Sequence, residues 1–218
     1  MRKYSSIVIL VALVVLSSCK QGSQLSKEKS IDVASTAAVS RLTPEQQMKF
    51  NYFYLEAIRM SESDHSTSAF ELLQHCRRIN PDAPEVDYSL SQFYSTLKDT
   101  SNVLRSMEAA VAKAPENTDY AEELAGDYVR YGHVDKSIAV YESLLNKRPD
   151  RSNLLDNLYV LYSQNKDYDK MISTLNRMEV IEGKNEKLSE EKFRIYVNQN
   201  KPKKAFEEME ALADKYPN

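Results

Sequence analysis

The chain has 218 residues, a formal net charge of −3 and a sequence pI near 5.7. It lacks the basic excess that binds the phosphates of nucleic acids, so the composition argues against a nucleic-acid partner. Only four glycines are present, 28% of the residues are charged and 14 are tyrosine. This composition favours an all-helical protein over one with sheets and tight turns.

The amino terminus has the order of charges and apolar residues that is typical of a secretory signal. It opens with the basic letters MRK, and residues 7–16 form an unbroken apolar run. The run is too short to cross a bilayer as a helix, which takes about 20 residues. It has the length of a signal-peptide core. We therefore expect residues 1–18 to be a signal peptide.

The apolar run ends in the letters LSSC at residues 16–19, which resemble the lipobox of bacterial lipoproteins. The resemblance implies that cleavage falls before Cys19, that its thiol carries a diacylglyceryl group and that its new amine is acylated, for example with palmitate. Two or three acyl chains give stable membrane anchoring. Since Lys20 and not Asp follows, the analogy favours the outer over the inner membrane of the cell envelope. The alternative is an ordinary signal peptide with an incidental cysteine.

Residues 19–42 differ in character from the rest of the chain. They are rich in Ser, Lys, Gln and Ala and have no aromatic residue, which predicts a flexible tether with a span of about 25–30 Å. A short helix over residues 32–39 is an alternative. Cys76 is the only thiol besides Cys19, so the mature chain has no intramolecular disulfide available.

The folded part is predicted to begin at the letters TPEQ, residues 43–46. Threonine followed three residues later by glutamine is a capping box, and proline suits the first helical position. Beyond this start, prolines stand at positions 81, 115, 149 and 217, and Gly183 takes the missing place. The step is 34 residues each time, which indicates an internal repeat.

Several further columns of residues keep the step of 34. They are Tyr94, Tyr128, Tyr162 and Tyr196; Leu90, Leu124 and Leu158; and Cys76, Ala110, Leu144, Met178 and Leu212. The pattern resembles the tetratricopeptide repeat, a helix–turn–helix unit. The resemblance implies an all-α fold over residues 43–218, an α-α superhelix (solenoid) of about five repeats at 50–83, 84–117, 118–151, 152–185 and 186–218. One such hairpin cannot bury its own apolar faces, so neighbouring repeats must stack.

Three local expectations follow from the columns. Asp135 is expected near the cap of a second helix, and the same column holds the capping residue types Thr67, Ser101 and Asp169, with Lys203 as the exception. Glu56 and Lys192 replace leucine in the first and fifth repeats, as expected for terminal repeats with one side in solvent. Phe206, Met209 and Leu212 should be partly uncovered on the last helix. Either the array continues, which we favour, or another chain covers this end.

The sequence holds no pattern that is specific for catalysis or metal binding. Asp64, His65 and Ser66 contain triad residue types but fall in a turn between helices, and His75 and His133 lie in different repeats. Cys76 falls on an inward column, which predicts a buried apolar role. There is no glycine-rich phosphate loop, HExxH or CxxC. We expect a non-enzymatic protein without catalytic residues, metal or cofactor, and without an evident small-molecule substrate.

Tetratricopeptide arrays usually bind a peptide or helix in the groove lined by the first helix of each repeat, and the resemblance assigns such positions here. They are Asn51, Tyr54, Tyr88, Gln92, Asp119, Glu122, Asn153, Asp156, Glu190 and Arg194, with Ile58, Glu85, Gly126, Val160 and Lys187 beside them. Glu122 and Asp156 stand where chaperone-binding members carry lysines. A neutral or basic partner segment is therefore expected, the alternative being that these acids form a solvated face. The tyrosine column is expected to pack between helices.

These features predict a membrane-anchored scaffold or adaptor that binds a segment of a protein partner. A second hypothesis is an assembly factor for outer-membrane proteins or cell-envelope polysaccharide. A third is the repeat part of a longer protein.

Overall fold

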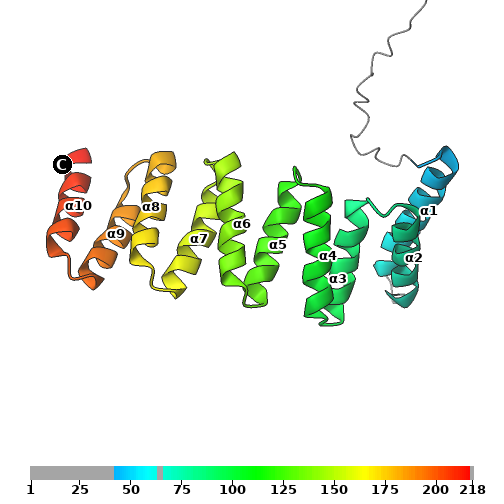
Figure 1. The fold of residues 1–218 in the computed structure, drawn as a ribbon. Coiled ribbons are helices and arrows are strands. Elements are labelled where there is room, and N and C mark those ends of the chain that lie inside the picture. The colour runs from blue at the N-terminus through cyan, green and yellow to red at the C-terminus, as the bar shows by residue number, and fades with distance from the viewer. Residues whose placement is uncertain (1–41, 63–65, 217–218) are drawn as a thin grey trace, which may run out of the picture. The chain divides into compact units, whose positions relative to one another are not determined.

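The structure is a computed structural model, and it describes residues 42–62 and 66–216. Within these residues it has ten helices and no strand (Figure 1). Their bounds are α1 Pro44–Ser61, α2 Ser66–Ile79, α3 Pro84–Thr96, α4 Thr100–Lys113, α5 Thr118–Arg130, α6 Val134–Lys147, α7 Ser152–Gln164, α8 Tyr168–Glu182, α9 Glu186–Asn198 and α10 Pro202–Lys215. The predicted signal peptide, Cys19, residues 20–41 of the predicted tether, Asp64 and His65 lie outside the described residues.

The helices pair into five helix–turn–helix units that follow one another in chain order (Figure 1). The first helices of units two to five begin at residues 84, 118, 152 and 186, again with a step of 34. Neighbouring units share their apolar surfaces. The ring of Phe70 on α2, for example, stacks on Phe93 of α3 with centroids 4.5 Å apart. The predicted all-α array of helix–turn–helix repeats is confirmed.

The predicted capping box at the start of α1 is present. The Gln46 N–H donates to Thr43 Oγ1 over 3.2 Å, and the Thr43 N–H donates to Gln46 Oε1 over 2.9 Å. The box satisfies two N–H groups that the first helical turn leaves without partners. Leu42, the residue before the cap, packs on the apolar cluster of the first repeat.

The predicted column lies near the caps of the second helices, as expected, and the caps themselves lie two residues before it. Ser101, Asp135 and Asp169 lie in the first turn of their helices, and the cap positions are Asp99, His133, Asp167 and Lys201. Of these, Asp99 and Asp167 accept a backbone N–H with their side chains, each over 3.2 Å. The physical reason is the turn before the cap. In this turn a single residue has the left-handed conformation, and the cap follows it directly. The second helix therefore begins one residue before the predicted column.

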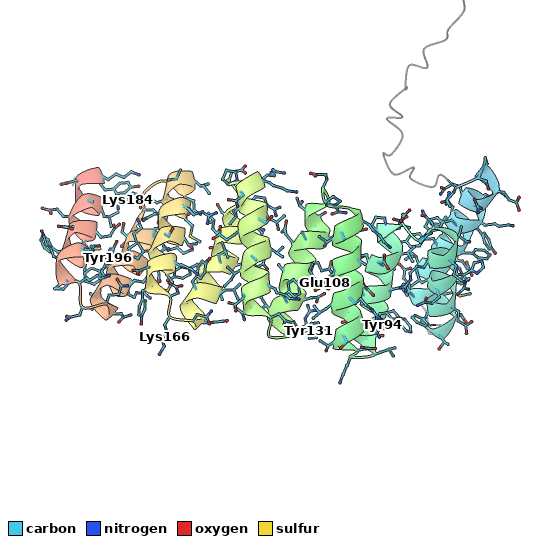
Figure 2. The ribbon with its side chains drawn as sticks, in the orientation of Figure 1. Tyr94, Glu108, Tyr131, Lys166, Lys184 and Tyr196 are labelled. Carbon is cyan, nitrogen blue, oxygen red and sulfur yellow. The ribbon has the colours of Figure 1, made fainter. Side chains whose placement is uncertain are left out.

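The left-handed residue of each turn also recurs with a step of 34. Lys98, Gly132, Lys166 and Asn200 have φ values of 56°, 81°, 54° and 55°, and Lys166 lies in the turn between α7 and α8 (Figure 2). Glycine adopts this conformation without a Cβ penalty, whereas other residues are strained by about 1 kcal/mol or more. Among these four described turns, only the one at Gly132 has glycine in the left-handed position.

The repeated columns form the core. Leu90, Leu124 and Leu158 are buried, and so is the inward series from Cys76 to Met178. Cys76 is fully buried, which confirms its predicted role as a small buried side chain. This burial raises the pKa of its thiol to about 11. In the tyrosine column, Tyr128 and Tyr162 are buried and donate their hydroxyls to Glu108 and Glu142, over 2.6 and 3.3 Å. Their packing role is confirmed.

Lys192 departs from the leucine column for a reason other than the one predicted. It does not face solvent, since only 3% of it is exposed. Its ammonium contacts the Glu179 carboxylate and lies 3.8 Å from Glu208, and Lys184 lies 3.0 and 2.5 Å from the same two carboxylates. The junction of the fourth and fifth repeats therefore replaces part of the apolar core with four ionic side chains. We call Glu179, Lys184, Lys192 and Glu208 the ionic cluster.

The last described helix leaves apolar side chains uncovered, as predicted. Phe206 is 69% exposed, and Met209 and Leu212 are half-buried. None of the helices in residues 42–62 and 66–216 is both long and apolar enough to span a membrane.

Candidate functional site

The candidate site is the surface carried by the first helices α1, α3, α5, α7 and α9, which we call the first-helix face. Most predicted groove positions on it are exposed: Asn51, Gln92, Asp119, Asn153, Asp156, Glu190 and Arg194. Tyr54, Tyr88 and Glu122 are half-buried.

The structure brings three predicted positions together around one cavity. Ile58 of α1 and Tyr88 and Gln92 of α3 line a hollow of about 310 Å³, and α2 contributes to its wall. The remaining lining residues are Ser61, Ala69, Leu73, Ser89, Phe93 and Thr96. The volume lies at the small end of the range of ligand pockets, which is about 300–1,000 Å³. We call it the first-helix cavity; its apolar walls and few polar groups suit a single large side chain.

Tyrosines on three successive first helices lie beside this cavity. Tyr88 stacks on Tyr120 of α5 with ring centroids 4.9 Å apart and an interplanar angle of 20°. The Tyr54 hydroxyl is 3.4 Å from the Glu85 carbonyl oxygen, to which it donates, and 3.2 Å from Ser89 Oγ. Burial, and then the nearby Glu123 carboxylate, raise the pKa of Tyr88 to about 12. These rings therefore present a neutral aromatic surface at pH 7.

Tyr120 was not among the predicted groove positions. Its helical spacing with Leu124 and Tyr128 placed it on the inward face of α5, but it is half-buried and packs against Tyr88 on the neighbouring repeat. No repeat signal marks it, because Tyr120 stands 34 residues after Val86 and 34 before Leu154, in a column of buried apolar residues.

The acidic character of the face is weaker at Glu122 than the sequence indicated. Arg151, the residue before α7, reaches back to Glu122 with two hydrogen bonds of 2.5 and 2.9 Å. The pair cancels the charge of Glu122. Asp119 and Asp156 are exposed and make no ion pair with any residue in the described part of the chain. Any repulsion of an anionic segment therefore rests on Asp119 and Asp156.

Two other contacts order the polar edge of the face. The Gln92 amide donates to Glu123 across repeats two and three, over 2.6 Å. Glu191 accepts the Tyr159 hydroxyl over 2.9 Å and lies 3.2 Å from Arg194. The charge of Arg194, a predicted groove residue, is thus partly neutralised by Glu191 on the same helix.

The described histidines do not converge with other ligand types. His75 packs its ring on Phe53 at 4.7 Å and lies 3.2 Å from Arg78 Nη2, whereas His133 precedes α6 in another repeat. Throughout residues 42–62 and 66–216, no group of three His, Cys, Asp or Glu side chains is placed to hold a metal ion.

Comparisons with known proteins bear on the fold. No protein-family model matches the sequence, and no protein of curated function matches it either. Several solved structures are similar. A tetratricopeptide repeat protein from Parabacteroides merdae is 17% identical, with 78% of this chain and 68% of that chain covered and a TM-score of 0.57.

MamA from Desulfovibrio magneticus RS-1 is 14% identical, with 76% and 94% of the two chains covered and a TM-score of 0.53. MamA AMB-1 is 16% identical, with 79% and 95% covered and a TM-score of 0.55. At these identities the likeness shows the fold alone. Together with the five helix pairs, it shows that residues 42–62 and 66–216 form an α-α superhelix of tetratricopeptide type.

Proposed function

We propose that this protein is a membrane-anchored scaffold that binds a segment of a partner protein along its first-helix face. The observation that carries the proposal is the first-helix cavity, where Ile58, Tyr88 and Gln92 meet. An apolar side chain of the partner segment fills this cavity. Full burial of a large apolar side chain contributes about 1.5–3 kcal/mol, and such buried anchors dominate most interfaces.

The rest of the segment lies across the stacked rings of Tyr88 and Tyr120. Aromatic surfaces of this kind contribute contact area at low entropic cost. The exposed carboxylates of Asp119 and Asp156 lie on helices further along the same face. They favour a neutral or basic segment over an acidic one.

The membrane anchor is proposed from the lipobox-like sequence at Cys19, with an outer-membrane location favoured by Lys20. Substitution Cys19→Ser should move the protein from the membrane to the soluble fraction after cell lysis and ultracentrifugation. The matched control is Cys76→Ala, which removes the other thiol and leaves the lipobox intact. Equal membrane retention of the Cys19→Ser variant and the parent contradicts the anchor.

Partner binding is tested with a photo-crosslinking amino acid at Gln92, on the rim of the cavity. The control position is Ser143, which is exposed on the second helix α6. We expect a crosslinked partner from intact membranes with the probe at residue 92, its loss when Tyr88→Ala is added, and no such product at residue 143. Identical products at both positions contradict the assignment. The identity of the partner separates a general adaptor from an assembly factor.

A further inference from the structure

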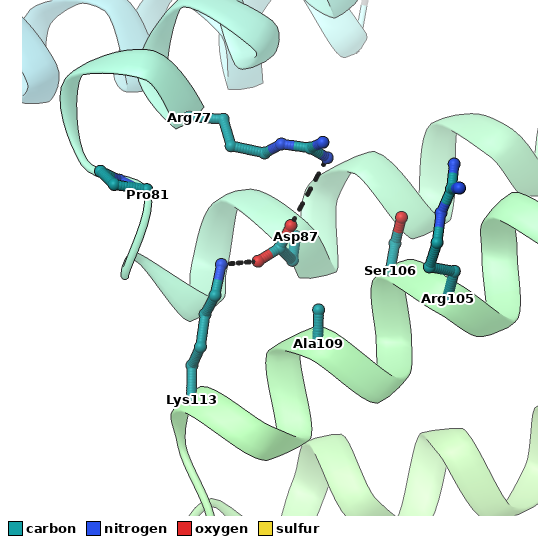
Figure 3. Close-up of a pocket in the computed structure, with 7 residues that line it drawn as sticks. All are labelled: Arg77, Pro81, Asp87, Arg105, Ser106, Ala109 and Lys113. Atoms are coloured by element: carbon teal, nitrogen blue, oxygen red, sulfur yellow. Dashed lines mark hydrogen bonds and ion pairs between the residues drawn. The ribbon is translucent and has the colours of Figure 1, made fainter.

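A second cavity lies away from the first-helix face and shares no residue with the first-helix cavity. It has a volume of about 310 Å³ and lies mainly between the second helices α2 and α4 (Figure 3). Its lining residues are Arg77, Pro81, Asp87, Arg105, Ser106, Ala109 and Lys113. We call it the second-helix cavity. Three of these side chains are cationic and one is a carboxylate, which leaves an excess of two positive charges.

The single carboxylate is already engaged. The Asp87 side chain is 4% exposed, and Lys113 Nζ contacts its Oδ2 while Arg77 Nη1 lies 3.8 Å from its Oδ1 (Figure 3). Arg77 and Arg105 retain further N–H donors, since a guanidinium has five. The positive excess therefore remains available to a ligand at the wall of the cavity.

A buried hydroxyl provides a second, independent observation. Ser106 is only 5% exposed and lines the cavity. Figure 3 shows the Ser106 hydroxyl between Arg105 and Asp87, with no hydrogen bond to any of the other lining residues drawn. Across residues 42–62 and 66–216, the fully buried side-chain atom without a partner is Ser137 Oγ rather than Ser106 Oγ, so the Ser106 hydroxyl is accessible from the cavity. The hydroxyl is placed to donate a hydrogen bond to an acceptor inside the cavity.

The other repeats serve as internal comparisons, because residues 34 apart occupy equivalent places. At the junction of the second and third repeats, the places of Arg77, Asp87, Arg105 and Ser106 are taken by the apolar residues Val111, Ala121, Ala139 and Val140. The fold therefore does not need polar side chains there. The junction of the first and second repeats carries them for a reason other than packing.

The junction of the fourth and fifth repeats is polar at the same places, but its charges balance. Glu179 and Ser189 stand at the places of Arg77 and Asp87, and Glu208 at that of Ser106. Two glutamates of the ionic cluster pair with two lysines, and the Ser189 hydroxyl donates to Glu208 over 2.9 Å. The second-helix cavity differs in having both an uncompensated positive charge and an unpartnered hydroxyl.

We propose that the second-helix cavity binds a small dianionic oxyanion, of the chemistry of a phosphate group. Arginine side chains bind phosphate oxygens with paired N–H donors, and Ser106 adds a neutral donor. Two negative charges match the excess of the lining side chains. The ligand does not compete with a partner segment for the first-helix cavity, because the two cavities are lined by different residues.

The test is equilibrium dialysis of the full chain, in detergent, with radiolabelled inorganic phosphate at constant ionic strength. We expect saturable binding of one phosphate per chain. Arg105→Gln removes a cation that takes no part in the Asp87 pairing and should raise Kd about tenfold or more, as for loss of a hydrogen bond to a charged group. Ser106→Ala removes the neutral hydroxyl and should raise Kd about fivefold.

The matched control is Lys203→Gln, which removes one exposed positive charge from α10 and should change Kd less than twofold. Absence of saturable binding, or equal weakening by Arg105→Gln and Lys203→Gln, overturns the proposal. Competition identifies the source of the group. Displacement of the bound phosphate by glycerol 3-phosphate supports a soluble ligand, displacement only by phosphatidic acid vesicles supports a lipid headgroup, and displacement by neither overturns the site.

Discussion

Restoring leucine at position 192 should destabilise the protein, although leucine is the residue that the repeat pattern favours. The Lys192 ammonium is buried among the carboxylates of Glu179 and Glu208. In Lys192→Leu, these two carboxylates share the single ammonium of Lys184, at 3.0 and 2.5 Å. One negative charge is then uncompensated in a largely buried site.

The magnitude follows from two opposing terms. Leaving a buried charge uncompensated costs about 3–5 kcal/mol. The Glu179 and Glu208 side chains are 21% and 13% exposed and keep Lys184, so we take about 2–3 kcal/mol. The leucine gains about 1 kcal/mol of apolar burial over the lysine stem it replaces. The net loss is about 1–2 kcal/mol.

The assay is urea unfolding followed by circular dichroism. With a slope of about 2 kcal/mol per molar urea, the midpoint should fall by about 0.5–1 M. The double variant Glu179→Leu with Lys192→Leu leaves one glutamate and one lysine 2.5 Å apart. It copies the apolar pair Leu145 and Leu158 of the preceding repeats and should recover the parent midpoint. A single variant as stable as the parent refutes the reasoning.

The remaining predictions concern the turns, pH and the first-helix face. Lys98→Gly and Lys166→Gly should each raise the free energy of unfolding by about 0.5–1 kcal/mol, because glycine relieves the left-handed strain. Gly132→Ala should lower the free energy of unfolding by about 1 kcal/mol. The prediction is contradicted if neither lysine variant raises the urea midpoint. The pKa of Glu179 is lowered, since its hydrogen bonds to Lys192 and Lys184 outweigh the opposing effect of burial. A carboxyl whose pKa is lowered in the folded state stabilises the fold at pH values above its unfolded-state pKa, which is near 4.5. This stabilisation is lost as the pH falls through the folded-state pKa. Acid titrations of the unfolding midpoint should therefore show a steeper loss below pH 4.5 in the parent than in Glu179→Gln, and parallel curves contradict this. Arg151→Gln should leave the Glu122 carboxylate unpaired and tighten the binding of a basic partner segment about twofold to fivefold, by about 0.5–1 kcal/mol. Unchanged affinity at low salt would show that Glu122 does not face the segment.

The period and order of the helices could be predicted from the sequence because they rest on local signals. Proline and the leucine and tyrosine columns recur at a fixed step, and the capping box at Thr43 marks the start of the first helix. The start of each second helix was harder to place. Asp99 and Ser101, and likewise Asp167 and Asp169, are all capping types. Only the left-handed turn decides between them.

Contacts between repeats could not be predicted, since each depends on side chains from different helices. Arg151 reaches Glu122 from the next repeat, and Lys192 is neutralised by residues of α8 and α10. The second-helix cavity is similar. Its charges come from three helices, and only the comparison with equivalent places in other repeats shows the imbalance.

The most direct test of the proposed scaffold function is hydrogen exchange of the full chain, with and without the partner segment identified by crosslinking at residue 92. We predict that protection on binding is concentrated in α1, α3 and α5, around Ile58, Tyr88 and Tyr120, and that it disappears in Tyr88→Ala. Protection confined to the second helices α4 and α6, with α3 unchanged, would contradict the account.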